Sequence, residues 1–218
     1  MQDTPNMICR PGRTRASRTF TPFSSELTKP PEGVLQAAYL TYDAQKTPLI
    51  NGLIANKPEC KSILIFTSKK TKVREIAREM KGRGYTVEGI SSDLEQSERE
   101  EVLLRFRSRQ TRVLVATDVM SRGIDVKDID LVINYDVPHD AEDYVHRVGR
   151  TARAEATGIA LTLVNPTDMY KFRKIEQLIK QVVIKLPVPA ELGESPKWEE
   201  GKAREGKRDI RYSKGRKK

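Results

Sequence analysis

The sequence has few of the features that mark secreted, membrane-spanning or metal-binding proteins. It contains two cysteines, Cys9 and Cys60, which do not stand at a metal-ligand spacing. No secretory signal segment is visible, so both thiols are expected to be free. No run approaches the roughly 18 consecutive apolar residues needed to span a bilayer. These absences predict a soluble, cytoplasmic protein without a membrane partner or a metal site in this chain.

Two phosphate-handling motifs are also missing. No glycine-rich loop ending in Gly-Lys-Thr or Gly-Lys-Ser occurs, and there is no Asp-Glu-Ala-Asp tetrad. Such groups cradle nucleotide phosphates and organise magnesium. The chain is therefore not expected to form a complete nucleotide-binding site by itself.

What the sequence has in excess is positive charge. It carries 40 Lys and Arg against 30 Asp and Glu, a formal net charge of +10. A polyanionic partner is favoured, because cations that neutralise phosphates gain from counterion release. Nucleic acid is the first expectation and an acidic membrane surface the second.

The chain divides into one domain and two tails. Residues 1–31 mix Pro, Ser, Thr and Arg without apolar periodicity, which predicts a disordered leader. Pro187 and Pro189 are expected to end the folded part, leaving 188–218 as a flexible basic tail. The remaining residues, 32–187, are enough for one well-buried domain.

Within that domain, short apolar runs alternate with helical periods, which is typical of βαβ units. Several runs are almost wholly apolar, as expected of strands covered on both faces. The pattern predicts an α/β fold of three layers, with a mostly parallel sheet between helices. The expected strands are 34–42, 62–67, 86–90, 112–116, 130–135 and 158–164, and the helical periods lie around 73–80, 102–106, 140–145 and 169–179.

The segment His146–Arg153 is the strongest candidate for chemistry. Three arginines, Arg147, Arg150 and Arg153, recur at a spacing of three, so on one helical turn they would project in neighbouring directions. A solvated basic helix face is the alternative. A glycine between the arginines, shortly after an apolar strand, favours cations aimed at one target. Guanidinium groups bind phosphate oxygens through paired hydrogen bonds, so a phosphate suits this geometry.

Three weaker segments also follow expected strands, where ligands of open α/β sheets bind. Ala116–Asp125 could be an ordinary helix cap at Thr117 or Asp118, but Asp125 could also take a ribose hydroxyl. Asp93–Arg99 has the composition of a capped first helical turn. Ile65–Ser68 is a buried strand that ends in two hydroxyls.

Together and in this order, the four segments resemble the C-terminal lobe of DEAD-box RNA helicases in helicase superfamily two. The resemblance covers about Pro30 to Pro187 and is most specific in the stretches ATDVMSRGID and HRVGRTAR. Val132–Pro138 matches the strand and loop between them. Ala152, where many members have glycine, and Glu155–Thr157 depart from the pattern. The resemblance implies a RecA-like domain.

The resemblance also implies roles for particular residues. Arg150 and Arg153 match catalytic arginines that reach the γ-phosphate of ATP, and Gly123 and Asp125 match further ATP contacts. His146 is either an orienting group between lobes or a structural histidine. Matching RNA-contacting positions are Thr67, Gly89, Asp93, Gln96, Arg99 and Thr117, and matching interlobe or orienting positions are His146, Arg147, Arg122 and Asp118.

In such helicases two lobes close on ATP and on one RNA strand. The implied partners are therefore RNA, bound through its backbone with low sequence selectivity, ATP with Mg²⁺ held by the first lobe, and that first lobe itself. A monomer is expected. Because the first-lobe motifs are missing, this sequence would be a truncated product, a mis-assigned start or an excised lobe, inactive alone.

Two other functions stay open. One is a catalytically inactive RNA-binding module that uses the half-cleft and the basic tail, in which Trp198 and Tyr212 could stack on bases. The other is a related motor that acts on duplex DNA.

Overall fold

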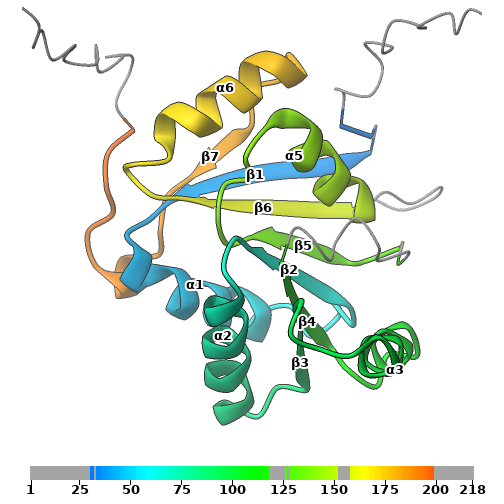
Figure 1. The fold of residues 1–218 in the computed structure, drawn as a ribbon. Coiled ribbons are helices and arrows are strands. Elements are labelled where there is room, and N and C mark those ends of the chain that lie inside the picture. Colours follow the sequence, from blue (N-terminus) through cyan, green and yellow to red (C-terminus); the bar gives the residue numbers. More distant parts are fainter. Residues whose placement is uncertain (1–29, 32, 118–125, 127, 152–157, 199–218) are drawn as a thin grey trace, which may run out of the picture.

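A seven-stranded parallel sheet forms the centre of the protein (Figure 1). The structure is a computed structural model and describes residues 30–31, 33–117, 126, 128–151 and 158–198. The strand order is β3-β4-β2-β5-β6-β1-β7, and every strand pair in this described part is parallel. The strands are β1 (Val34–Leu40), β2 (Ile63–Thr67), β3 (Val87–Ile90), β4 (Val113–Thr117), β5 (Leu131–Asn134), β6 (Gly158–Val164) and β7 (Ile184–Leu186).

The six strands expected from the sequence are confirmed, with ends that move by at most two residues. Their apolar runs are buried on both faces, and Ile63–Thr67 is buried at every position. The seventh strand, β7, was not expected. It has only three residues and pairs with Ala37–Tyr39 of β1 at one side of the sheet. So short a strand has no periodicity to detect.

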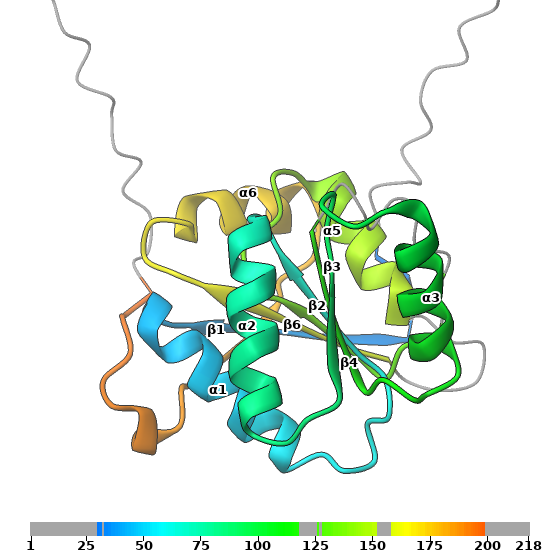
Figure 2. The same ribbon diagram turned by 60° about the horizontal axis from the view of Figure 1, so that its bottom comes forward.

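Helices cover both faces of the sheet and complete three layers (Figure 2). The helices α1 (Asp43–Ala55) and α2 (Lys70–Gly82) pack on one face. On the other face, α3 (Gln96–Arg107) packs over β2, β3 and β4, whereas α5 (Ala141–Val148) and α6 (Met169–Ile179) pack over β1 and β6. The expected α/β architecture is confirmed. No helix in the described ranges is long and apolar enough to cross a membrane.

Sequence periodicity did not predict α1. Pro48 lies inside this helix, where proline removes a backbone hydrogen bond, and its buried side includes the polar residues Lys46 and Asn51. Tertiary packing decides the outcome instead. Leu49, Ile50 and Ile54 are buried against the sheet and fix the helix in place.

The packed chain continues past Pro187, where the sequence predicted a flexible tail to begin. Val188 and Leu192 pack against the core on the α1 side. The Gln45 side chain of α1 donates hydrogen bonds to the carbonyl groups of Leu192 and Glu194, at 2.9 and 3.0 Å. Trp198 packs on Phe172 with ring centroids 6.3 Å apart, instead of standing free to stack on a base. The predicted leader, up to residue 29, and the tail from 199 lie outside the described residues.

Candidate functional site

The six positions expected to contact RNA gather near the carboxyl ends of three adjacent strands. Thr67 and Thr117 are the last residues of β2 and β4 and lie opposite each other in the sheet. Gly89 is the last residue but one of the neighbouring β3. Asp93 follows β3, and the remaining two positions, Gln96 and Arg99, lie in the first turn of α3. The parallel arrangement therefore brings these positions to one edge of the sheet.

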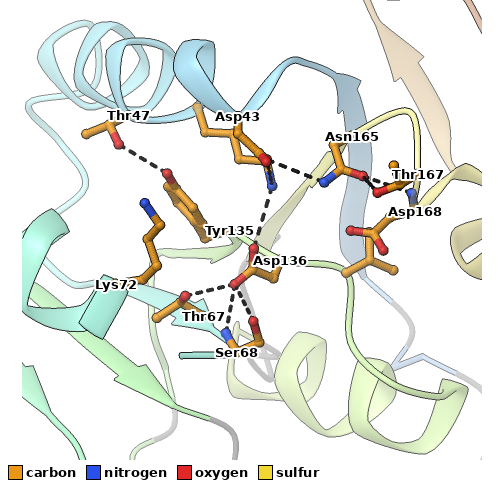
Figure 3. Close-up of polar contacts among 12 residues, drawn as sticks. Asp43, Thr47, Thr67, Ser68, Lys72, Tyr135, Asp136, Asn165, Thr167 and Asp168 are labelled. Carbon is orange, nitrogen blue, oxygen red and sulfur yellow. Dashed lines mark hydrogen bonds and ion pairs between the residues drawn. The ribbon is translucent and has the colours of Figure 1, made fainter. Parts of the chain in front are cut away.

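Thr67 is held inside the domain. Its side chain is fully buried, and its hydroxyl donates a hydrogen bond of 2.8 Å to Oδ2 of Asp136 (Figure 3). The same oxygen accepts hydrogen bonds from the backbone N–H and the hydroxyl of Ser68, at 2.8 and 2.9 Å. Thr67 thus fastens the end of β2 to the end of β5. At this end of β2, Ser68 is the exposed residue that a ligand could contact.

Asp136 is the centre of a polar network that crosses four elements. Burial by itself would raise the pKa of its carboxyl group, but hydrogen bonds from Ser68 and Thr67 and the positive charge of Lys46 outweigh burial and hold the pKa below its usual range. Asp136 is therefore an ionised acceptor near neutral pH. Sequence analysis noted this residue only as part of a matching stretch. A polar residue directly after a buried strand was the available signal.

Lys46 supplies the buried positive charge of this network. Its side chain is 1% exposed, and Nζ lies 2.9 Å from Asp43 and 3.6 Å from Asp136. It also lies over the ring of Tyr135, at 5.1 Å from the centroid. Lys46 was not among the predicted site residues, because the helix that carries it, α1, has no periodicity that predicts it.

Asp93 and the start of α3 are held by nearby charges. Lys70 donates to Asp93 at 2.8 Å, and Arg74 forms a second ion pair with it. The hydrogen bond from Lys70 is the largest cause of a lowered pKa at Asp93. In the first turn of α3, Arg99 donates to the carbonyl of Leu94 at 2.9 Å and to the Gln96 side chain at 3.3 Å. The capped first turn that the sequence predicted is present, because the backbone N–H of Glu95 donates to Glu98.

Gly89 is required by packing. A Cβ atom at this position would lie 2.8 Å from Cγ1 of Val73, closer than real Cβ contacts allow. The glycine therefore lets α2 approach β3 closely. This packing role stands beside the RNA contact that the resemblance implies.

The arginine segment does not form one continuous helix. The helix α5 ends at Val148, and a 3₁₀ turn, η2 (Gly149–Thr151), follows. The prediction that Arg147 and Arg150 project in neighbouring directions is wrong, because Arg147 is 2% exposed and points into the domain. Its guanidinium donates to Oδ1 of Asn134 and to the carbonyl of Asp136, at 3.1 and 3.0 Å. It also stacks over the ring of Phe66.

Arg150 is half-buried and lies at the opposite edge of the sheet from Asp136. Its carbonyl accepts a hydrogen bond from Ile129, just before β5, and the Thr151 hydroxyl donates to the carbonyl of Ile129. Sequence analysis had sought this segment at the carboxyl edge. The eight residues of α5 run back along the sheet for about 12 Å and carry the chain to the amino edge.

The start of β6 fixes the same turn. A Cβ atom on Gly158 would lie 1.9 Å from the carbonyl oxygen of Thr151, so only glycine fits there. The turn that carries Arg150 is thus hydrogen-bonded to Ile129, just before β5, and packed closely against Gly158, at the start of β6.

Several expected site residues lie outside the residues that the structure describes. These are Asp118, Arg122, Gly123, Asp125 and Arg153. His146 is half-buried on α5, and both interpretations of this histidine stay open. Within the described part, no group of three His, Cys, Asp or Glu side chains could hold a metal ion.

Comparison with known proteins identifies the family to which this fold belongs. The family described as "Helicase conserved C-terminal domain" matches residues 45–155. The chain belongs to this family. Its relatives place it in the DEAD-box branch, as a C-terminal RecA-like lobe.

Two curated relatives match more than half of this helicase lobe. Eukaryotic initiation factor 4A of Dictyostelium discoideum is 42% identical over 125 residues, which are 57% of this chain and 31% of the relative. The ATP-dependent RNA helicase CshA of Listeria monocytogenes is 44% identical over 126 residues, 58% of this chain and 24% of the relative. The lobe therefore spans about a quarter to a third of these relatives.

Solved structures show the same fold. A DEAD box protein from Methanococcus jannaschii superposes with a TM-score of 0.66 at 37% identity, covering 71% of this chain and 42% of that chain. The DEAD-box protein SrmB of E. coli, bound to the regulator of ribonuclease activity RraA, superposes with a TM-score of 0.69 at 33% identity. That match covers 77% of this chain and 99% of the SrmB chain.

Proposed function

We propose that this lobe completes an ATP-dependent RNA helicase by supplying Arg150 and Arg153 to the nucleotide and a backbone-binding edge to RNA. The observation that carries the proposal is the difference in burial between Arg147, which is inside the domain, and Arg150, which is partly exposed. Arg147 is buried against Asn134 and Phe66, whereas Arg150 lies on a turn that Ile129 and Gly158 pin from both sides. A firmly held, partly exposed arginine suits a phosphate that arrives from a second lobe.

ATP with Mg²⁺ would be shared between two lobes. In this lobe Arg150, Arg153, Gly123 and Asp125 would contact the nucleotide, and the first lobe would hold the metal. An arginine that meets the γ-phosphate stabilises the negative charge that spreads over its oxygens during transfer. RNA would lie across the carboxyl ends of β2, β3 and β4, where polar groups meet phosphates and sugar hydroxyls without reading bases.

A trans-complementation assay tests this function. The chain is mixed with a separately made first lobe, and RNA-stimulated ATP hydrolysis is measured. We expect turnover above that of the first lobe alone and none from this chain alone. Arg150→Gln should lower the stimulated rate by roughly 10³-fold or more, as for other arginine fingers. Arg83→Gln, on the exposed end of α2, is the matched control and should leave the rate unchanged. No stimulation by the unmodified chain would refute the proposal.

A second candidate is an RNA-binding module that works without catalysis. It is favoured by the excess of positive charge, 40 Lys and Arg against 30 Asp and Glu, which suits a phosphate backbone without any catalysis. Deletion of residues 199–218 separates the sources of RNA affinity. Salt-sensitive binding that survives the deletion would belong to the lobe, whereas complete loss would assign binding to the tail.

The same binding assay separates an RNA helicase from a related motor that acts on duplex DNA. Equal binding of RNA and DNA strands would favour the DNA motor instead.

A further inference from the structure

The two sides of α2 carry charge in different ways. On one side, Lys72 pairs with Glu75 at 2.6 Å, and Arg83 pairs with Glu79 at 3.7 Å. The other side carries four cations and no carboxylate of its own, at spacings of four, four and three residues. These four residues, here called the cationic stripe, are Lys70, Arg74, Arg78 and Lys81. Such spacings place side chains on one face of a helix.

The cationic stripe borders a groove of about 560 Å³ between α2, β3 and the start of α3. Arg74, Arg78 and Lys81 line one wall. The apolar lining comes from Val73, Ala77, Gly89 and Leu94. Because Gly89 has no side chain, the backbone of β3 contributes to the groove directly.

The two halves of the stripe differ in their partners. Lys70 and Arg74 both pair with Asp93 at the carboxyl edge. Further along α2, Arg78 and Lys81 are exposed, and neither makes an ion pair with a carboxylate in the described part of the chain. The second carboxylate of the groove, Glu98, accepts a hydrogen bond from the backbone of Glu95. The far half of the groove is therefore the more positive half.

The groove is continuous with the expected RNA edge. α2 begins next to Asp93 at the carboxyl edge and runs back toward the amino edge, so its stripe covers about 16 Å at the helical rise of 1.5 Å per residue. Evenly spaced cations along a groove suit the repeating phosphates of a single strand.

The tails of this chain are poor occupants of the groove. Residues 1–29 carry five Lys or Arg against two Asp or Glu, and residues 199–218 carry nine against four. Both are positive and would be repelled by the stripe. The occupant must be an anion from elsewhere.

We propose that the groove along α2 is a second RNA-backbone site, in which Arg78 and Lys81 bind phosphates of the strand after it leaves the carboxyl edge. This inference rests on the proposed RNA function and extends the RNA path by the length of α2. The ligand is the sugar-phosphate backbone of single-stranded RNA, and the site does not select sequence.

Fluorescence anisotropy of the full chain with oligouridylates of about 6 and about 12 nucleotides tests the site. The unmodified chain should bind the longer strand more tightly and with a steeper salt dependence. The double variant Arg78→Gln/Lys81→Gln should lose roughly 10- to 30-fold in affinity for the longer strand near 0.1 M salt. Its slope of log affinity against log salt should flatten by about 1.4, since each lost single-strand contact contributes about 0.7. Binding of the shorter strand should change by less than about twofold.

The matched control is Lys61→Gln/Lys174→Gln, which removes the same charge from exposed positions away from the groove. It should leave both affinities unchanged, and because both double variants retain the basic tail, a difference between them reports the groove. Equal losses in both variants would overturn the inference, and so would an unchanged affinity of Arg78→Gln/Lys81→Gln for the longer strand. If that variant instead lost only binding to an acidic peptide such as oligoglutamate, the groove would be a protein site and the inference wrong. No RNA binding by the unmodified chain would refute the proposed function as well.

Discussion

The network around Asp136 and the cationic stripe of α2 are both rich in charge, but they differ in burial and in partners. In the network, Lys46 is 1% and Arg147 is 2% exposed, and each lies among acceptors of the domain itself. In the stripe, the side chains of Lys70 and Arg74 are 58% and 67% exposed. Only the stripe leaves charge available to a ligand.

This difference predicts what each region contributes. Removal of a buried donor leaves its acceptors unsatisfied and costs about 1–3 kcal/mol for each of them. Exposed ion pairs contribute about 0–1 kcal/mol, because water screens them. The Asp136 network should therefore govern folding, and the stripe should govern binding. Three sets of substitutions test this assignment of folding to the network and of binding to the stripe.

The largest expected effect is that of Arg147→Met. This change removes the hydrogen bonds to Asn134 and Asp136 and the cation above Phe66, while it preserves most of the side-chain volume. The free energy of unfolding should fall by about 2–4 kcal/mol in urea titrations followed by circular dichroism, because two acceptors inside the domain lose their donor.

Arg83→Met is the control for a lost arginine. Its side chain is 54% exposed and its pair with Glu79 is long, at 3.7 Å, so stability should change by less than about 0.5 kcal/mol. If Arg147→Met were as mild as this control, the buried network would not be a folding element. Should Arg147→Met fail to fold, Arg147→Lys, which keeps the charge but loses the planar donor pair, should give an intermediate loss.

Arg147 also shows how far the sequence could predict the site. Its motif and spacing identified the arginine segment, but spacing alone cannot separate an arginine that enters the core from one that stays outside. The acceptors that hold Arg147 inside the domain, Asn134 and the carbonyl of Asp136, lie 13 and 11 residues earlier in the chain, and the spacing within the arginine segment does not reveal them.

The fold was predictable where buried segments have a simple apolar sequence pattern. Strands such as Ile63–Thr67 are apolar throughout because helices cover both faces. The helix α1 was not predicted, because Pro48 lies inside it and the charged residue Lys46 lies on its buried side. The helix propensity of this segment is low, and packing against the sheet stabilises the helix instead. The RNA-edge positions came together as expected, because parallel strands align their carboxyl ends. The inward hydrogen bond of Thr67 depends on Asp136, which is remote in sequence.

A smaller effect is expected from acid, and it compares one carboxylate from each region. The folded pKa of Asp136 lies below the value of about 3.9 for an unfolded aspartate. Its ionised form therefore stabilises the fold above that pH, and this contribution is lost as pH falls through the folded pKa. Asp136→Asn should lower stability near neutral pH by about 1.5–3 kcal/mol, as for lost hydrogen bonds to a charged group. It should also flatten the decline of stability below pH 4.

Asp93→Asn is the comparison within the groove. The pKa of Asp93 is also lowered, through the hydrogen bond from Lys70, but water reaches this pair. Its substitution should change the acid limb of the stability curve much less than Asp136→Asn does. Equal flattening by the two variants, measured by urea unfolding from pH 2 to pH 7, would contradict the distinction between a carboxylate whose cationic partner is buried, Lys46 at 1% exposure, and one whose partners are exposed, Lys70 and Arg74 at 58% and 67%.

The smallest expected effect on stability is that of Arg78→Gln/Lys81→Gln. Neither side chain makes an ion pair with a carboxylate in the described part of the chain, and both are exposed, so only a weak, water-screened attraction such as that between Arg78 and Glu75 is lost. Glutamine is a good helix former, which keeps the α2 backbone preference almost unchanged. The free energy of unfolding should stay within about 0.5 kcal/mol of the unmodified chain. A small gain is physically reasonable, because the stripe places like charges one turn apart and their repulsion is relieved. A loss above about 1 kcal/mol would mean that the stripe stabilises the fold, and weaker RNA binding by this variant could then no longer be assigned to missing phosphate contacts.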